Sequence, residues 1–333
     1  MQTWVAALAI LIAPASAQAA PVTCVDGSCT TARITPKVKA IIEKQPDRKT
    51  VQIRLYSESG LTNADLKSLE LVPWLRNLDL LCEGDGCAKV TDFSPLAKLV
   101  DLEQLDATGA DHFTSLAPLT GAKKLRWLRL WKVPVADIGA LKDKPLKKLQ
   151  LDSYRLKSLD ALAGNTTLAS LTVDVEESTD VSAIAGLVTL GELSLRGGAI
   201  TSSKLFARLA KLFDLGIANK KLSEISGLAP LAQLEFLSIA APVTDLSPIK
   251  GLAKLKHLSL RSMPATTLPA LATRVLAKVD FRGTVFADLT PLAASPELWS
   301  VALAKETSPR AVEALRKLVP KVEITFDRGK GVD

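Results

Sequence analysis

Residues 234–260 read LEFLSIAAPVTDLSPIKGLAKLKHLSL, and this stretch decides the fold. The pattern Leu-x-x-Leu-x-Leu occurs in it twice, in a conservative form that begins at Leu234 and in full form from Leu255. The alternating residues at the end of each pattern predict a short strand with its leucines on one face. The segment between the two patterns predicts a return along the outer side. One strand-and-return unit is therefore 255 minus 234, or 21 residues long.

The same unit recurs along most of the chain. Its first position falls at residues 50, 75, 102, 125, 146, 168, 190, 212, 234, 255, 276, 298 and 319, with steps of 21 to 27 residues. Such a period indicates stacked repeats, because one unit cannot bury its own leucines and its neighbours must complete the core. Prolines suited to the first position of a short helical or 3-10 turn recur in the return segments, at Pro95, Pro118, Pro230, Pro248 and Pro291. Aspartates that can cap such turns stand at Asp92, Asp137, Asp245 and Asp288.

The leucine spacing resembles that of the leucine-rich repeat family over about residues 50 to 325. The short Asp-Leu-Ser-Pro units are most similar to the repeats of bacterial internalin-type proteins. The resemblance implies an α/β leucine-rich repeat solenoid, right-handed and curved, with a parallel β-sheet on the concave face and short helical or 3-10 segments on the convex side. The family's asparagine at the ninth position of each repeat is missing, as Val133, Tyr154 and Lys220 illustrate. The leucine pattern supports the fold without it.

Composition agrees with a leucine-built core. The 333 residues include 56 leucines but only 5% aromatic residues, so leucine is the packing unit. Length alone would suggest about two domains, whereas the repeat predicts one continuous body. The expected organisation is a signal peptide at 1–20, an N-terminal cap at 21–49, a repeat domain at 50–325 with a C-terminal cap helix at 309–318, and a polar tail at 326–333.

The first residues predict export. Trp4 to Ala13 form an apolar run of ten residues, too short to cross a bilayer, and small residues with an A-x-A pattern follow Pro14. We interpret residues 1–20 as a signal peptide, with a hydrophobic helix of the fold as the alternative. The expected protein is not membrane-spanning, and its expected location is periplasmic or secreted.

The ends of the solenoid need caps. Thr35-Pro36 predicts the start of a helix over 36–44 that covers the first repeat. Ser308-Pro309 predicts the C-terminal cap helix, with Val312, Leu315 and Leu318 facing inward.

The four cysteines form two close pairs, Cys24 with Cys29 and Cys82 with Cys87. Local disulfides within each pair are our prediction, and cross-pairing between the two loops is the alternative. A Cys₄ zinc site is the disfavoured interpretation of the same four thiols, because such sites usually belong to reducing compartments. We therefore predict no metal.

No catalytic constellation is recognisable. The two histidines, His112 and His257, are about seven repeats apart, and the sequence has no G-x-S-x-G motif, phosphate-binding loop or dinucleotide-binding motif. We predict a protein that is not an enzyme and uses no cofactor.

Recognition residues are expected at the third, fifth and seventh positions of each repeat, which point out of the concave sheet. One strand carries Trp127, Arg129 and Trp131 at these positions, while its core positions already hold leucine. Trp and Arg are enriched in binding hot spots; a Trp–Arg stack that only shields the sheet is the alternative interpretation. Charged residues of neighbouring strands would surround this group, namely Asp79, Asp106, Lys148 and Asp152.

A second candidate cluster lies toward the C-terminus and comprises Phe236, His257, Arg261, Lys278 and Arg282. The net charge of +7 does not make the chain a nucleic-acid binder, because its basic residues are dispersed over both faces. The first functional hypothesis is a scaffold that binds a protein or peptide through the concave face. The second is a cell-wall glycan-binding module in which Trp127 and Trp131 contact sugar rings.

Overall fold

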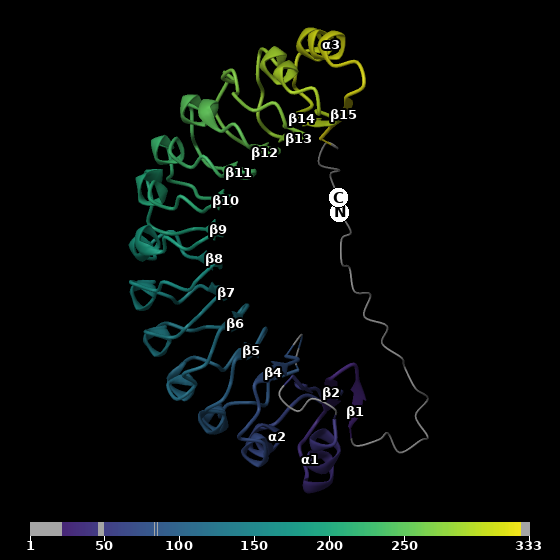
Figure 1. Cartoon of the computed structure of the whole chain (residues 1–333), viewed down its shortest axis with the longest axis vertical. Coiled ribbons are helices and arrows are strands. Elements are labelled where there is room, and N and C mark those ends of the chain that lie inside the picture. The colour runs from purple at the N-terminus through teal and green to yellow at the C-terminus, as the bar shows by residue number, and fades with distance from the viewer. Residues whose placement is uncertain (1–21, 46–49, 83, 85, 328–333) are drawn as a thin grey trace.

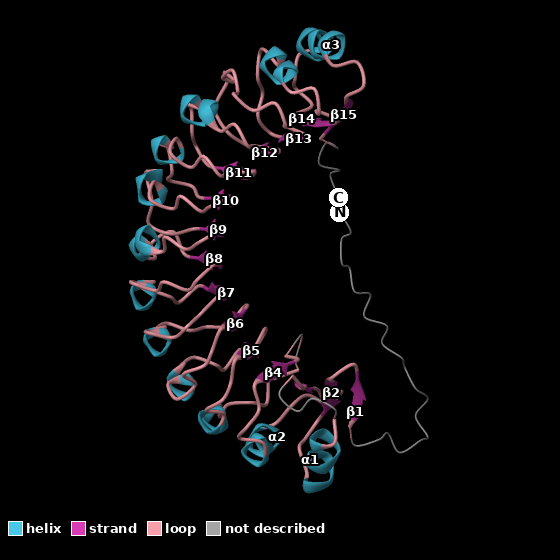
Figure 2. Cartoon of the chain, in the orientation of Figure 1, coloured by secondary structure: helices cyan, strands magenta, loops and turns pink. Residues whose placement is uncertain are grey.

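A computed structural model gives the three-dimensional arrangement of the chain and describes residues 22–45, 50–82, 84 and 86–327. The chain winds into an arc in which strands line the inner side and short helices and turns lie along the outer side (Figures 1 and 2). This is the curved solenoid that the repeat pattern predicts. The predicted signal peptide lies outside the described residues, as does most of the predicted polar tail.

One sheet runs through the whole arc, and its strands follow one another in sequence order. The first two strands form an antiparallel hairpin, and every later neighbour is parallel. All thirteen strands expected from the leucine pattern are present, as β3 to β15. The strands of the described residues are β1 (Thr23–Val25), β2 (Ser28–Thr31), β3 (Gln52–Leu55), β4 (Asn77–Leu80), β5 (Gln104–Asp106), β6 (Trp127–Leu130), β7 (Lys148–Ser153), β8 (Ser170–Val175), β9 (Glu192–Arg196), β10 (Asp214–Ala218), β11 (Phe236–Ala240), β12 (His257–Leu260), β13 (Lys278–Phe281), β14 (Ser300–Leu303) and β15 (Glu323–Phe326).

The leucines of each strand form a single continuous core that reaches from Val22 to Val322. In the repeat of β6 the three pattern leucines, Leu125, Leu128 and Leu130, are each 0% exposed. Because successive side chains of a strand point to opposite faces, burying these leucines places the alternate residues on the concave surface. The strand register thus fixes which residues a partner can reach.

Short 3-10 turns form the convex side, as the prolines and aspartates predict. Pro95, Pro118, Pro248 and Pro291 stand in the first turn of their segments. Pro230 does not, because the turn in its repeat already ends at Leu228. The 3-10 segments are Ser68–Leu71, Ser94–Lys98, Ala117–Leu119, Gly139–Leu141, Asp160–Leu162, Ser182–Gly186, Ser203–Phe206, Ser226–Leu228, Ser247–Gly251 and Thr290–Ala294.

The four predicted capping aspartates each accept a hydrogen bond from the backbone amide two residues later. Asp92, Asp137, Asp245 and Asp288 do so at 2.8–2.9 Å. These bonds satisfy amides that the first turn of a helix leaves without a partner.

The N-terminal cap is a hairpin followed by a helix. Cys24 and Cys29 face each other across β1 and β2 and form a disulfide, and β2 then pairs in parallel with β3. The sequence predicted a loop at this point, and the structure makes it the first part of the sheet. Helix α1 (Pro36–Glu43) follows, capped by Thr35 and buried through Val38 and Ile42.

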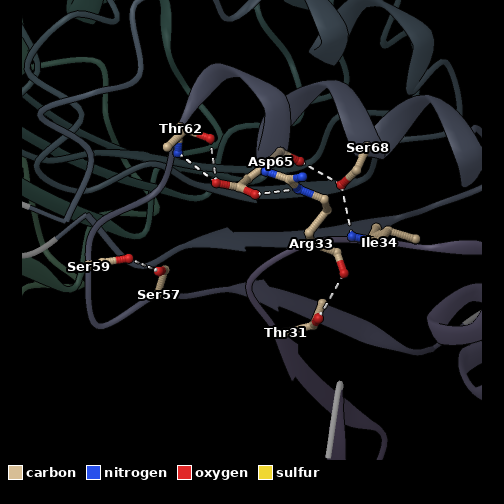
Figure 3. A network of polar contacts seen from close by, with 8 residues as sticks. All are labelled: Thr31, Arg33, Ile34, Ser57, Ser59, Thr62, Asp65 and Ser68. Carbon is tan, nitrogen blue, oxygen red and sulfur yellow. Dashed lines mark hydrogen bonds and ion pairs between the residues drawn. The ribbon is translucent and has the colours of Figure 1, made fainter.

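A polar network fastens this cap to the first repeat (Figure 3). The carboxylate of Asp65, in helix α2 (Asn63–Lys67), accepts hydrogen bonds from Arg33 at 2.6 Å and from the backbone and hydroxyl of Thr62. Ser68 accepts a bond from the backbone of Ile34 and donates one to the carbonyl of Asp65. The cap and the first repeat therefore share buried hydrogen bonds as well as apolar contacts.

The second predicted disulfide, between Cys82 and Cys87, closes the loop after β4, and both cysteines are buried. The local pairing is thus confirmed for both cysteine pairs, and the cross-paired alternative is wrong.

Helix α3 (Pro309–Leu318) begins where Ser308 and Pro309 predict it and ends at the predicted residue. Val312 and Leu315 face the core as expected, together with Ala311. Leu318 does not face the core. It is the last residue of the helix, and 55% of its surface is exposed.

One asparagine, Asn219, makes the backbone hydrogen bonds that the family's ninth-position asparagines would make between repeats. Asn219 is 3% exposed, and its amide nitrogen donates to the carbonyls of Gly197 and Gly198 and to the carboxylate of Glu177. Its side-chain oxygen accepts hydrogen bonds from the backbone amides of Lys221, at 2.8 Å, and Leu222, at 2.7 Å. Asn219 stands one residue before the ninth position, which is why the repeat pattern did not reveal it.

Candidate binding surface on the concave face

The parallel register aligns equivalent residues of successive repeats into columns that run along the arc. Third-position residues from β4 to β7 are in register, as are fifth-position residues. Neighbouring strands lie about 4.8 Å apart, so side chains in one column stand close enough to contact each other. A binding surface here is built from short runs of adjacent columns.

Trp127, Arg129 and Trp131, which we call the tryptophan patch, lie on β6 and directly after it. Leu128 and Leu130 between them are buried, while the three patch residues are each partly exposed on the concave side. The sequence therefore placed the register correctly. Both tryptophans are half-buried rather than fully exposed, because rings of this size cover residues of the neighbouring strands only about 4.8 Å away.

Arg129 forms an ion pair with Asp106 on the adjacent strand. Its Nη1 lies 3.6 Å from Oδ2 of Asp106, and Asp106 also accepts two hydrogen bonds from Thr108. The Nε of Arg129 is enclosed and makes no hydrogen bond within the described part of the chain. The guanidinium is thus oriented by Asp106, while its enclosed Nε is out of a partner's reach.

The other charged residues that the sequence assigned to this surface lie at different distances from the tryptophan patch. Lys148 is the direct register neighbour of Trp127 on β7. Asp79 lies one strand beyond Asp106 and forms an ion pair with Arg54 at 3.4 Å. The structure therefore brings Asp106 and Lys148 to the patch and leaves Asp79 at its margin.

Asp152, the remaining predicted residue, lies at the end of β7 and faces Asp174 of β8 in register. Burial raises the pKa of the Asp152 carboxyl, against the opposing effects of Lys132 and Arg196. Burial also raises the pKa of Asp174, whose carboxylate lies 3.2 Å from the Arg196 guanidinium. Two partly buried carboxyls and the Arg196 guanidinium therefore lie together near the centre of the concave face.

The second candidate cluster forms a hollow in the surface. Its volume is about 290 Å³, and it is lined by Asp214, Phe236, Leu237, Ser238, His257, Leu258, Ser259, Lys278 and Asp280. Phe236 and His257 are register neighbours, and their rings meet edge to face with centroids 4.8 Å apart. Three of the five residues predicted for this cluster thus line one hollow.

The two remaining residues, Arg261 and Arg282, flank the hollow through Asp280. The Asp280 carboxylate lies 2.6 Å from Nη2 of Arg282 and 3.5 Å from Nε of Arg261. Burial would raise the pKa of Asp280, but its hydrogen bonds to Arg282 and the charges of both arginines hold that pKa below its usual range. Asp280 is therefore ionised and saturated with partners at neutral pH.

His257 is the histidine of this hollow. Burial lowers its pKa, and the nearby charges of Lys278 and Lys256 lower it further. Its imidazole is neutral at pH 7, so it acts here as an aromatic wall.

Sequence reasoning missed Asp214 and Ser259 as parts of this site. The signal was present in the columns: Asp214, Phe236, His257 and Lys278 occupy the third position of four successive repeats. Burial and the neighbouring charge of Glu192 raise the pKa of the Asp214 carboxyl.

The side chains of the concave face offer aromatic surfaces, charged groups and hydrogen-bonding groups to a binding partner. His112 follows β5 and His257 begins β12, and these two strands lie far apart along the arc (Figure 1). No group of three or more metal-ligating side chains occurs among the described residues. Within the same residues, no helix has the length and apolar character needed to cross a membrane.

Comparison with solved structures assigns the fold. The chain is similar to the internalin InlF of Listeria monocytogenes, with 22% identity and a TM-score of 0.62 over 88% of this chain and 94% of that one. It is also similar to a leucine-rich repeat protein of Leptospira interrogans, with 18% identity and a TM-score of 0.51 over 89% of this chain and 93% of that one. A third similar structure is TLR13 in complex with ssRNA13, with 17% identity and a TM-score of 0.58 over 89% of this chain and 49% of that one.

These similarities show that the chain has the leucine-rich repeat fold, in the form seen in bacterial internalin-type proteins. No protein-family model and no curated protein matches the sequence.

Proposed function

We propose that this chain is an exported, non-catalytic recognition scaffold that binds a protein or peptide through its concave face. The tryptophan patch is the observation that carries the proposal. Its three side chains stand on the concave surface of one repeat, and the core beneath them is already complete without them. A sheet that needed only solubility would not need large aromatic residues at these positions; β9 and β10, for example, carry the small residues Ser194 and Gly216 at the fifth position.

The chemistry of the patch favours a protein partner. Arg129 is oriented by Asp106 and stands between Trp127 and Trp131 along the chain, and Lys148 adds a charge beside Trp127. Oriented arginine flanked by partly buried tryptophan is typical of hot spots in protein interfaces. No observation on the described residues favours a glycan over a protein.

Two local disulfides support export to the periplasm or the medium. Disulfides persist in oxidising compartments and are rare in the cytosol. The apolar run and small-residue pattern at 1–20 add a sequence argument for the same destination.

The test is capture of partners from an exported-protein fraction by the immobilised chain, followed by affinity measurements with each purified partner. Trp127→Ala and Trp131→Ala should each weaken binding by about 2 kcal/mol, close to thirtyfold. Trp299→Ala is the matched control, because Trp299 is 54% exposed and directly precedes β14, eight strands away from β6. It should change the affinity less than about twofold.

The proposal fails if partner affinity is unaffected by every concave substitution. Binding of a glycan array that depends on Trp127, with no protein captured, would replace the proposed partner class with carbohydrate.

A further inference from the structure

The hollow between β10 and β13 has a low floor and two charged ends. Its floor is low because the fifth-position residues Ser238 and Ser259 are small and adjacent in register, and Gly216 continues this row on β10. Phe236 and His257 rise beside this floor at the third position. A backbone can therefore approach the sheet here while its side chains meet the third-position column.

One end of that column is acidic. Asp214 is an exposed residue that lines the hollow, and Glu192 is its register neighbour on β9. Asp214 forms no ion pair within the described residues, whereas Glu192 accepts a hydrogen bond from Ser170 at 2.9 Å. Two adjacent carboxylates without a cation attract a positively charged group.

The other end is basic. Lys278 is an exposed residue on β13 and likewise forms no ion pair among the described residues. Its neighbours are already matched: Lys256 lies 2.6 Å from Glu235, and Asp280 is held by two arginines. Lys278 is thus the unmatched cation of the hollow, and Asp214 is its unmatched anion.

The middle of the column is an apolar seat. The Phe236 and His257 rings lie edge to face, and burial together with Lys278 and Lys256 lowers the pKa of His257, so the ring pair is uncharged at pH 7. An aliphatic or aromatic side chain placed there would bury its surface against both rings.

The spacing of these three features matches an extended chain. Asp214 and Lys278 are three strands apart, which at about 4.8 Å per strand is about 14 Å. In an extended peptide, alternate side chains point the same way, and residues four apart are separated by about 13 Å. A peptide lying across the strands would therefore place residues one, three and five over the acidic end, the ring pair and the basic end.

We propose that the hollow between β10 and β13 binds an extended segment of a protein partner that carries a basic, an apolar and an acidic side chain at alternate positions. The basic side chain lies at Asp214 and Glu192, the apolar one on Phe236 and His257, and the acidic one at Lys278. This inference rests on the proposed function, since it gives the partner class and a second contact site on the same concave face.

The experiment selects displayed random peptides on the immobilised full chain and measures the affinity of individual synthetic peptides from the enriched pool. The enriched pool should show the basic–x–apolar–x–acidic pattern in one or both chain directions. Asp214→Lys should weaken a selected peptide by about tenfold or more, and replacing that peptide's basic residue with glutamate should restore binding to the variant. Lys278→Glu should weaken the same peptide by a similar factor, and replacing the peptide's acidic residue with lysine should restore binding to that variant.

Three outcomes overturn the inference. The first is a pool without the charge pattern. The second is an affinity that stays within about twofold after both charge reversals. The third is loss of binding that no peptide substitution restores. Since Asp214 and Lys278 are both exposed, thermal melts of these variants should match that of the unaltered chain.

A parallel set with Trp127→Ala separates this inference from the proposed function. Peptides that require Trp127 but ignore Asp214 and Lys278 would overturn the hollow as a peptide site and leave the recognition scaffold intact. An absence of any peptide that depends on concave residues would overturn both.

Discussion

The Nε of Arg33 lies 2.6 Å from Oδ1 of Asp65, so a residue of the N-terminal cap holds a carboxylate of the first repeat. The second oxygen of that carboxylate accepts two bonds from Thr62. Asp65 is 6% exposed, and its removal leaves these donors without an acceptor. Asp65→Ala should lower the free energy of unfolding by about 2–3 kcal/mol, measured by urea denaturation. Asp111→Ala, at an exposed loop position, is the control and should change it by less than about 0.5 kcal/mol.

The same carboxylate should make the cap sensitive to acid. Burial alone would raise the pKa of Asp65, but hydrogen bonds from Thr62 and Arg33 outweigh it and hold that pKa below its usual value of 3.8. As the pH falls below 3.8, the unfolded chain therefore takes up a proton before the folded chain does. The stabilisation is present above this pH and is lost below it. The stability difference between the unaltered chain and Asp65→Asn should shrink on acidification, and a constant difference between pH 7 and pH 2 would contradict this account.

Core and surface positions of β6 should respond differently to truncation. Leu128 is 0% exposed, and Leu128→Ala should cost about 2–5 kcal/mol, because it leaves a cavity. Trp127 keeps contact with solvent, so Trp127→Ala should cost only about 1–2 kcal/mol. Equal losses in urea denaturation would mean that the Trp127 ring is part of the core.

Lys144 is a buried amine without a carboxylate partner in the described structure. Its Nζ donates to the carbonyls of Ala122, at 2.9 Å, and Thr120, and burial together with Lys123 lowers its pKa to about 8. Between pH 8 and the usual value of 10.5 the unfolded chain binds the extra proton, so stability from this group rises with pH. The stability difference between the unaltered chain and Lys144→Met should grow by about 2–3 kcal/mol, in favour of the unaltered chain, from pH 7.5 to pH 10.5.

The control for this titration is Lys142→Met, since Lys142 is exposed two residues earlier. It should leave the pH dependence of unfolding as it is in the unaltered chain. A flat difference for Lys144→Met would show that the Lys144 ammonium is solvated in the folded chain.

Asn219 should be among the most sensitive polar residues of the arc. Its amide makes five hydrogen bonds to groups from three repeats. Asn219→Ala should cost about 2–4 kcal/mol in urea denaturation, because it strands buried carbonyls and amides. Asn219→Asp should be no better, because it keeps the acceptor but points a charge at the Gly197 and Gly198 carbonyls. A milder effect of Asn219→Asp would mean that the acceptor half of the amide carries the contribution.

The fold was predictable because the leucine spacing is a direct result of core packing. Leu234 and Leu255 occupy equivalent slots, and nothing else about their surroundings was needed to place β11 and β12. The tryptophan patch followed from the same register. Lys144 and Asn219 were not predictable, because their burial depends on carbonyls of adjacent repeats that come together only when the arc forms. The hollow was found in part: its aromatic and basic residues stood out by type, whereas Asp214 gains its place only from its register with Phe236.

Because the strands of the sheet follow one another in sequence order, the number of repeats between two sites fixes the distance between them. The tryptophan patch on β6 and the ring pair that begins on β11 are five strands apart, or about 24 Å along the sheet. Deleting one complete repeat between them, such as residues 190–211, would shorten that distance by about 4.8 Å while keeping each site's own residues. The distance between the two sites can therefore change only by whole repeats. Gain or loss of one repeat would alter which partners can contact both sites at once, without altering any contact residue.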